Sequence, residues 1–362
     1  MAQVEMWKQF WSGKRVLITG HTGFVGSWLA LCLIQLDAKV VGYSIGVPTE
    51  PSLFEACELR SQLESITADV RNAEKLSEAV HFHEPQFIFH LAAQPLVTKS
   101  YLDPLETYGT NVIGTVNLFE AVRTLDRETI VVNMTSDKCY ENNSKANGYT
   151  EDDELGGKDP YSSSKACSEL ITRAYRESFF KTDAVDRSKI SLSSIRAGNI
   201  IGGGDWAMYR LIPDSIRAFE TGNKLEIRYP NAVRPWQHVL DVVYALLHLS
   251  KTIVGDRSLD NQAWNVGPNQ ETKWSVEDVV RFFSKHWDGP TMWEIDRGDH
   301  FMEEVLLTLD NSKARQQLGW RPVWNTETAL IETLKWYQGY KKFPEKASKI
   351  TIEQIESYIT SI

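Results

Sequence analysis

Two groups of residues in this chain could carry chemistry together. Gly20, Gly23 and Gly26 follow an apolar run in TGHTGFVG, and Tyr161 and Lys165 lie four residues apart in YSSSK. Glycines between a strand and a helix let the backbone approach a pyrophosphate, whose charge faces the helix N-terminus. Two side chains four residues apart share a helix face, so an ammonium can stabilise the phenolate of a proton-transferring tyrosine. Each motif alone also fits a tight turn or a solvated helix, but together they indicate a dinucleotide site with a catalytic tyrosine.

The segments that must position these residues alternate between strand-like and helix-like patterns. Residues 15–19 are typical of a buried strand and residues from 24 onward of a helix, so the glycines fall in the turn between them. This βαβ rhythm predicts an α/β fold, a doubly wound parallel (Rossmann) sheet with a smaller α/β C-terminal lobe. The expected strands are 16–19, 39–43, 87–91, 130–135 and 191–195, and the expected helices are 24–35, 73–82, 105–125 and 161–179.

The composition changes in the second half of the chain, which contains a GGGD string and several Pro and Trp residues. We expect residues 1–198 to form the dinucleotide-binding Rossmann domain, with residues 236–264 returning to it. Residues 199–235 and 265–340 would form the substrate-binding lobe, and residues 341–362 a C-terminal tail without an assigned role. Ligands are then expected between the lobes, at the carboxyl ends of the strands.

Composition narrows the class of protein. The 362 residues include 39 Lys and Arg against 48 Asp and Glu, and no dense basic stripe is present that would meet nucleic-acid phosphates. The chain contains no run of about 18 apolar residues that could span a membrane and no signal-peptide core, so we expect a cytoplasmic protein. The four cysteines are scattered and lack metal-ligand spacing, which predicts reduced thiols and no metal site.

Further strings resemble the extended short-chain dehydrogenase/reductase family over nearly the whole chain. Besides TGHTGFVG and YSSSK, they are DV at 69–70, HLAAQ, TN at 110–111, MTSDK and LDNSKARQQLGWRP. The resemblance implies that Tyr161 takes the substrate hydroxyl proton, that Lys165 lowers the pKa of the tyrosine and holds the nicotinamide ribose, and that Ser136 ends the preceding strand. It also implies a cofactor site made by Gly20, Thr22, Gly23, Phe24, Val25, Gly26, Asp69, Val70, Leu91, Ala92, Ala93, Thr110, Tyr161 and Lys165.

The expected cofactor is NAD, although these residues alone leave NADP open. The acidic residue that binds the ribose hydroxyls of NAD normally ends the second strand, but this chain offers Gly42, Tyr43 and Ser44 there. No arginine replaces the acid, as a 2′-phosphate would prefer. We therefore favour NAD, held partly by Asp69 and Val70 and more loosely than in relatives that carry the acid.

An acid–base pair, Asp137-Lys138, follows Ser136, as it does in nucleotide-sugar 4,6-dehydratases. The strings TSDKCYEN, RAGNIIGGGDW and RPWQHVLD most resemble the members of that group that act on CDP-glucose. The resemblance implies oxidation at C4 of the hexose, loss of water across C5–C6 and reduction at C6, giving a 4-keto-6-deoxy sugar and regenerated NAD. Asp137 would be the acid and Lys138 the base, with the reverse assignment open.

The acid–base pair carries a geometric requirement. Adjacent residues on extended backbone point to opposite faces, so a local bend must present both side chains to one substrate. An aspartic acid that donates a proton needs a raised pKa, and a lysine that accepts one must be uncharged. A surface Asp-Lys ion pair in a loop stays possible.

Arginines suited to the substrate diphosphate lie beyond the Rossmann half. Arg234 and Arg210 offer planar donor groups, although Arg210 also fits a solvated helix position. Asn199 is expected beside the diphosphate and Gln94 beside the hexose. His21, His90 and His238 are expected to be packed or hydrogen-bonded and not catalytic.

The expected partners are a nucleotide sugar and further copies of the chain, with no nucleic acid and no membrane. Residues 105–125 and 161–179 resemble helices that form a four-helix interface in the family, which implies a homodimer or homotetramer. The nearest alternative is a nucleotide-sugar 4-epimerase or reductase that uses Ser136, Tyr161 and Lys165 and leaves Asp137-Lys138 idle. A non-catalytic nucleotide-sensing protein is less favoured because Tyr161 and Lys165 are both present.

Overall fold

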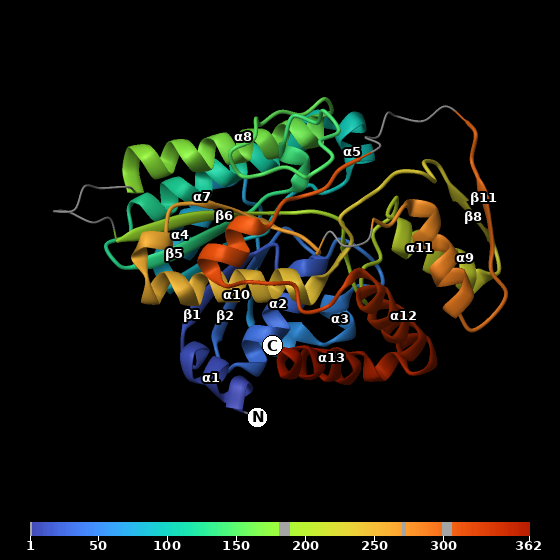
Figure 1. Ribbon diagram of the computed structural model, residues 1–362. Coiled ribbons are helices and arrows are strands. Elements are labelled where there is room, and N and C mark those ends of the chain that lie inside the picture. Colours follow the sequence, from blue (N-terminus) through green and yellow to red (C-terminus); the bar gives the residue numbers. More distant parts are fainter. Residues whose placement is uncertain (1, 181–188, 270–272, 299–305) are drawn as a thin grey trace.

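The computed structural model describes residues 2–180, 189–269, 273–298 and 306–362 (Figure 1). Its centre is a seven-stranded sheet in the order β10-β6-β5-β4-β1-β2-β3, with every pair parallel. The strand order reverses between β1 and β4, which is where a doubly wound sheet binds its ligand. The strands are β1 (Arg15–Thr19), β2 (Lys39–Ser44), β3 (Glu64–Thr67), β4 (Phe87–His90), β5 (Thr129–Met134), β6 (Ile190–Ala197) and β10 (Ala263–Val266).

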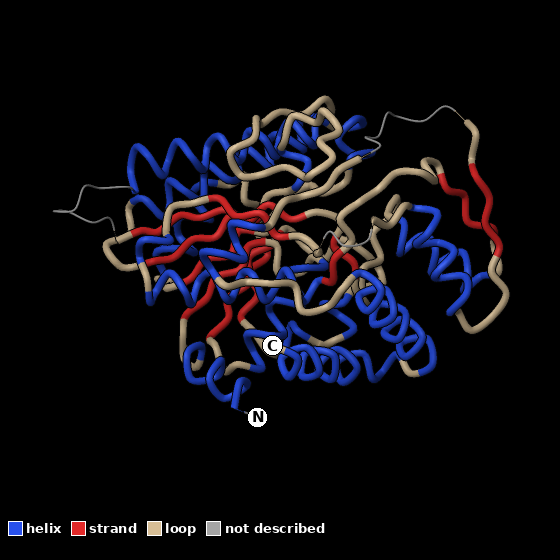
Figure 2. Tube along the Cα trace, viewed as in Figure 1, coloured by secondary structure: helices blue, strands red, loops and turns tan. Residues whose placement is uncertain are grey.

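Helices cover both faces of this sheet, as Figure 2 shows. Val16 and Ile18 pack into one apolar core and Leu17 into another, because successive strand residues point to opposite faces. Two buried faces explain the almost continuously apolar strands, and the predicted α/β doubly wound fold is confirmed. The first core is covered by α2 (Phe24–Gln35) and α10 (Val239–Gly255), and the second by α4 (Ala73–His83), α7 (Gly114–Arg123) and α8 (Pro160–Tyr175).

A smaller lobe projects to the right in Figure 1. It contains α9 (Leu211–Thr221), α11 (Val276–His286) and a parallel pair, β8 (Lys224–Ile227) with β11 (Met292–Ile295). The expected domain boundary at residue 264 falls inside β10, which belongs to the main sheet. Residues 270–272 and 299–305 of the predicted lobe lie outside the described residues.

The predicted C-terminal tail is a packed helix. After α12 (Thr326–Lys342), α13 (Ala347–Ser361) lies against α1 (Ala2–Trp11), α2 and α3 (Leu53–Ala56). The Trp336 indole donates to the Thr351 hydroxyl at 2.9 Å, and Ile355 is buried. These contacts tie the end of the chain to the start of the Rossmann fold.

The remaining elements are short. They are α5 (Val97–Leu102), α6 (Pro104–Tyr108), β7 (Ile200–Ile201), β9 (Gln237–His238), the 3₁₀ turns η1 (Leu59–Ser61), η3 (Asp137–Cys139), η5 (Arg257–Leu259) and η7 (Pro344–Lys346), and the π-helical turns η2 (Gly109–Ile113), η4 (Arg176–Phe180) and η6 (Ala314–Leu318). The predicted helix 105–125 is the continuous run α6-η2-α7. Within the described ranges, no helix is long and apolar enough to cross a membrane.

Candidate active site

Helix α8 places Tyr161 and Lys165 at the carboxyl end of β5. The helix begins after Asp159, whose carboxylate accepts the Ser162 amide at 3.0 Å, with Pro160 in its first turn. Both side chains are buried, and the Lys165 ammonium donates to the Met134 carbonyl at 3.3 Å. Tyr161 and Lys165 therefore lie at the end of β5, the strand that leads to Ser136.

Burial dominates the electrostatics of this pair. Burial raises the pKa of Tyr161 to about 12, against the opposing effects of a hydrogen bond with the Ser136 side chain and the charge of Arg210. Burial also lowers the pKa of Lys165 to about 8. In the free protein, desolvation of the phenolate thus outweighs the neighbouring groups that favour it, and the role of Lys165 in lowering the pKa of Tyr161 stays a prediction.

The turn η3 supplies the bend that the Asp-Lys pair requires. The Ser136 hydroxyl accepts the Lys138 amide at 3.2 Å and donates to Asp137 Oδ1 at 2.9 Å. A 3₁₀ turn rotates successive residues by about a third of a turn, so neighbours no longer face opposite ways. Asp137 is buried and Lys138 is half-buried.

The carboxyl group of Asp137 has the properties of a proton donor. Burial raises its pKa, while Lys138, the Ser136 hydroxyl and Arg234 act in the opposite direction. Its Oδ2 atom is buried, and no described residue donates a hydrogen bond to it. Since Ser136 donates to Oδ1, Oδ2 is the oxygen that can carry the proton of the neutral acid.

Gly198, which sequence reasoning missed, makes room for that carboxyl group. A Cβ atom at Gly198 would lie 2.0 Å from Asp137 Oδ2, far inside contact distance. Gly198 directly follows β6, and its carbonyl accepts a hydrogen bond from the side-chain amide of Gln237 at 3.0 Å. The RAGN string contained this glycine, but only the fold brings it against Asp137.

The two predicted arginines bring positive charge to the same site. Arg210 is the residue before α9, pairs with Asp205 at 2.9 Å and lowers the pKa of Tyr161 by its charge. Arg234 is buried, donates to the Val233 carbonyl at 3.0 Å and acts on the pKa of Asp137. Arg210 is thus not a solvated mid-helix residue.

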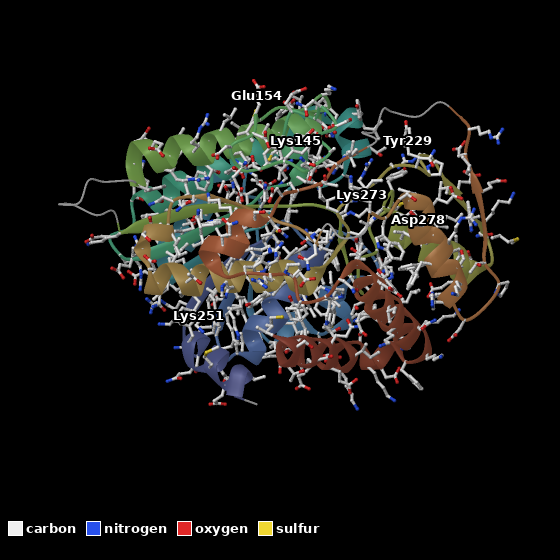
Figure 3. The ribbon with its side chains drawn as sticks, in the orientation of Figure 1. Lys145, Glu154, Tyr229, Lys251, Lys273 and Asp278 are labelled. Carbon is white, nitrogen blue, oxygen red and sulfur yellow. The ribbon has the colours of Figure 1, made fainter. Side chains whose placement is uncertain are left out.

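A pocket beside Arg234 extends the site toward the smaller lobe. Figure 3 places Lys273 between the main sheet and that lobe, and the Lys273 ammonium donates to the Ala146 carbonyl at 3.4 Å. Asn199 is half-buried, with its carbonyl accepting the Gln237 amide at 3.3 Å. The pocket is lined by Val233, Arg234, Pro235, Pro268, Asn269, Lys273, Trp274, Thr308, Leu309 and Thr326, of which only Arg234 had been predicted.

The glycine turn fits the pyrophosphate of NAD. Gly20 has a φ of +79°, and a Cβ there would lie 2.8 Å from backbone atoms of Leu91 and Ala92. A Cβ at Gly26 would lie 2.1 Å from the Gly20 carbonyl. Because Gly23 caps α2 without a side-chain hydrogen bond, the first amides of α2 stay open to an anion.

Other predicted cofactor residues surround this turn. The Thr22 hydroxyl donates to the Gly46 carbonyl at 2.6 Å, and Phe24 and Val25 are half-buried in the first turn of α2. Leu91, Ala92 and Ala93 form the half-buried loop after β4, and Thr110 is half-buried in η2. The loop, the turn and α2 therefore converge at the reversal between β1 and β4.

Asp69 lies two residues after the end of β3. Its carboxylate pairs with Arg71 at 2.6 Å, and hydrogen bonding from Arg71 lowers its pKa. The Tyr43 hydroxyl donates to the Asp69 carbonyl at 3.1 Å, which connects the ends of β2 and β3. Val70 is buried against Gly114. The end of β2 itself offers no carboxylate.

Gln94 is hydrogen-bonded within the loop after β4. Its amide group donates to the Leu96 carbonyl at 3.0 Å and the Thr107 hydroxyl at 2.9 Å, and accepts the Leu96 amide at 2.7 Å. Both donor positions are thus engaged inside the protein, and the amide oxygen, which can accept a second hydrogen bond, is the atom left for the predicted contact with a hexose. The side chain holds the loop after β4.

The three histidines near the motifs are buried. His90 bonds to the Thr19 and Thr115 hydroxyls, and His21 to those of Ser44 and Ser65. His238 packs edge-on against Trp28 and Trp324. Burial lowers the pKa of His21 to about 4, and the pKa of His90 and of His238 to about 3. They are neutral packing residues, as expected.

Solved structures similar to this chain share its fold. A dTDP-glucose 4,6-dehydratase from Bacillus anthracis in complex with NAD superposes with a TM-score of 0.74 at 23% identity, over 91% of this chain and 98% of that one. A UDP-glucose 4-epimerase from Thermotoga maritima superposes with a TM-score of 0.75 at 21% identity, over 90% and 99%. Dehydratases and epimerases are thus alike in fold, and the fold does not choose between them.

Sequence comparison is more selective. A CDP-glucose 4,6-dehydratase of Salmonella typhimurium is 45% identical over 333 residues, which is 92% of this chain and 93% of that protein. A UDP-glucose 4-epimerase of Mycoplasma genitalium is only 24% identical over 346 residues. A family model described as GDP-mannose 4,6 dehydratase matches residues 17–333. The resemblance noted from the motifs is confirmed, and the chain belongs to this family of nucleotide-sugar dehydratases.

Proposed function

We propose that the protein is an NAD-dependent CDP-glucose 4,6-dehydratase, which converts CDP-D-glucose to the 4-keto-6-deoxy sugar. The observation that carries the proposal is Asp137, whose buried carboxyl group has a raised pKa, beside Ser136 and Tyr161. An epimerase needs no such acid. The Salmonella relative, 45% identical, is named for this substrate.

The first task of the site is oxidation at C4. NAD, when bound, accepts a hydride from C4 of the hexose and later returns it to C6. Tyr161 takes the proton of the C4 hydroxyl, and Ser136 hydrogen-bonds to Tyr161. With its pKa about 12, Tyr161 is neutral in the free protein, so substrate binding must favour its charged form through Arg210, Lys165 and Ser136.

The second task is loss of water. The new 4-ketone makes the C5 proton acidic, and Lys138 takes it, while Asp137 gives a proton to the C6 hydroxyl, which leaves as water. Return of the hydride to C6 and of a proton to C5 completes the product. Tyr161 has then gained a proton and Asp137 has lost one. Ser136 donates to Asp137 at 2.9 Å and contacts Tyr161, so it can pass the proton back.

The phosphates are assigned to the arginines. Arg234 and Arg210 carry their charges next to Asp137 and Tyr161, which would place the diphosphate at the lobe boundary with the hexose toward α8. Asn199 is assigned to the same part of the site. We infer that the cytosine lies in the pocket that includes Lys273 and Trp274.

A substrate panel tests the proposal. CDP-, dTDP-, GDP- and UDP-glucose are incubated with the protein and catalytic NAD, and products are identified by mass spectrometry and sugar analysis. We expect rapid loss of one water from CDP-glucose alone, without net reduced cofactor. A C4 epimer of unchanged mass, or preference for another nucleotide, would contradict the proposal.

The assembly and location belong to the same proposal. Leu105, Ile113 and Leu170 are 85%, 52% and 43% exposed on α6, η2 and α8, which supports a homodimer or homotetramer through these helices. We also predict that the protein acts in the cytoplasm. Light scattering of wild-type protein and of Leu170→Glu tests the assembly, with a smaller particle expected for the variant.

A further inference from the structure

A buried ion pair that takes no part in the proposed reaction lies beneath the active site. Glu169 of α8 and Arg196 of β6 are 2.8 Å apart, with 1% and 6% of their side chains exposed. Burial opposes the charged carboxylate, but the charge and hydrogen bonds of Arg196 hold the pKa of Glu169 below its ordinary value. The pair is therefore ionised, and loss of one partner would leave a buried unpaired charge.

The residue before the catalytic turn is attached to this pair. The Thr135 hydroxyl donates to Glu169 Oε1 at 2.5 Å, and the Thr135 amide donates to the Ile195 carbonyl at 2.8 Å. The other carboxylate oxygen, Glu169 Oε2, accepts hydrogen bonds from Arg196 at 2.8 Å and from the Ser194 hydroxyl at 3.0 Å. Both oxygens of Glu169 are thus used.

The residue after the turn is attached to the other member. Arg196 Nη1 donates to the Tyr140 hydroxyl at 2.8 Å, and its guanidinium lies 5.0 Å from the centre of the Tyr140 ring. The Tyr140 hydroxyl in turn donates to Asn265 Oδ1 at 2.6 Å. Residues 136–139 therefore run between two anchors that belong to one ion pair.

Few other bonds join the turn to the rest of the protein. The Gly156 amide donates to the Cys139 carbonyl at 2.9 Å and Ser136 contacts Tyr161, while the other bonds of Ser136, to Asp137 and to the Lys138 amide, stay inside the turn. Asp137 Oδ2 has no protein donor among the described residues. Since neither of these bonds involves the side chain of Asp137 or Lys138, the direction of the acid and base toward the hexose depends strongly on what holds positions 135 and 140.

We propose that Glu169 and Arg196 are positioning residues that clamp both ends of the Ser136–Cys139 turn and thereby set Asp137 and Lys138 for elimination. The catalytic part of this inference rests on the proposed function. A purely structural ion pair would instead stabilise the packing of α8 on β6 with no particular effect on the turn.

Single-hydroxyl variants test the clamp while leaving the ion pair intact. Thr135→Val cuts the link to Glu169, and Tyr140→Phe cuts the link to Arg196. Matched controls are Thr129→Val, at the far end of β5, where the hydroxyl donates to the Pro85 carbonyl at 2.9 Å, and Tyr149→Phe. Tyr149 is equally buried and stacks on Tyr140 at 5.2 Å, but its hydroxyl donates to Asn142.

The first readout is amide hydrogen exchange of peptides that cover residues 135–141, measured without substrate. Loss of one such hydrogen bond should speed exchange of the turn about tenfold in Thr135→Val and Tyr140→Phe. The controls should leave these peptides unchanged. Exchange in the clamp variants no faster than in the controls would overturn the proposal.

The second readout is turnover of CDP-glucose. The clamp variants should lose about tenfold in kcat with KM nearly constant, and reduced cofactor should accumulate because elimination lags behind oxidation. Faster exchange with an unchanged kcat would overturn the catalytic part. If wild-type protein dehydrates no nucleotide sugar, the proposed function fails, and the exchange data still decide whether the clamp exists.

Discussion

Lys138 is the residue whose loss should separate oxidation from elimination. It is half-buried in η3 beside Asp137, and the mechanism gives it only the C5 proton. Lys138→Met, which is close in volume, should oxidise C4, retain reduced cofactor and form almost no 6-deoxy sugar. Stopped-flow absorbance of reduced nicotinamide and product analysis measure this.

The control for that variant is Tyr161→Phe, which should fail to oxidise C4 at all, with a loss of at least about 10² in turnover. If Lys138→Met forms 6-deoxy product at near wild-type rate, Lys138 has no catalytic role, and an epimerase or reductase becomes the better functional assignment.

Gly198 should be as sensitive as the catalytic residues although it does no chemistry. A methyl group at this position would lie 2.0 Å from Asp137 Oδ2 and must displace the carboxyl group. Gly198→Ala should lower kcat by about 10² or more, the contribution of a placed general acid, while the protein stays folded. Gly255→Ala is the control, since no atom lies within 4 Å of a Cβ there. Equal kcat values for the two variants would disprove the role of Gly198.

Lys165 should lower the stability of the fold while serving catalysis. Its pKa falls from 10.5 to about 8 on burial, so at pH 7 it is charged in both states and the native state bears a cost of about 3 kcal/mol. Between pH 8 and 10.5 the unfolded chain binds more protons, so this cost disappears as pH rises. Lys165→Met should be inactive yet more stable than wild type by up to about 3 kcal/mol at pH 7.

Urea unfolding of the two proteins at pH 7 and pH 10 measures the Lys165 effect. The stability difference should shrink at the higher pH. A variant less stable than wild type at both pH values would show that the Lys165 bond to Met134 outweighs the desolvation of the ammonium.

At the scale of elements, helix α13 is fastened to the fold through a buried carboxyl group. The Tyr358 hydroxyl of α13 donates to Asp241 Oδ1 at 2.6 Å, and the Val323 amide donates to the same atom at 2.7 Å. Burial raises the pKa of Asp241 to about 7. Between pH 4 and 7 the native state thus binds more protons than the unfolded state, and stability falls as pH rises.

Asp241→Asn should remove that pH dependence. The amide oxygen can still accept both hydrogen bonds, and no charge has to be buried. The variant should match wild type near pH 4 and exceed it by up to about 4 kcal/mol above pH 8. Denaturant titrations at the two pH values check this, and equal pH slopes for both proteins would contradict it.

Most helices and strands near the site could be predicted from the sequence. β1, α2, β5 and α8 lie within a few residues of their predicted bounds, because their apolar runs and caps are local signals. The role of α13 could not be predicted, because its amphipathic pattern does not indicate which surface the helix covers. β10 was assigned across a domain boundary because its partner, β6, is far away in sequence.

At the scale of the whole molecule, the motifs predicted which residues meet but not the tertiary contacts that tune them. Ser136, Tyr161 and Lys165 do converge, as contiguous motifs at strand ends must in this fold. Arg196 and Gly198 lie in the RAGN string, but nothing in that string indicates that they meet Glu169 and Asp137. The raised pKa of Tyr161 likewise follows from burial that only the packed structure reveals.

One measurement tests the central claim, that this protein catalyses a dehydration and not an epimerisation. Wild-type protein is incubated with CDP-glucose and catalytic NAD in D₂O, and the product is analysed by mass spectrometry and proton NMR. The account predicts a 4-keto-6-deoxy sugar on CDP, with one deuterium at C5 from the acid–base step and a C6 methyl group that keeps the hydrogen from C4. A C4 epimer of CDP-glucose without deuterium at C5 would contradict it.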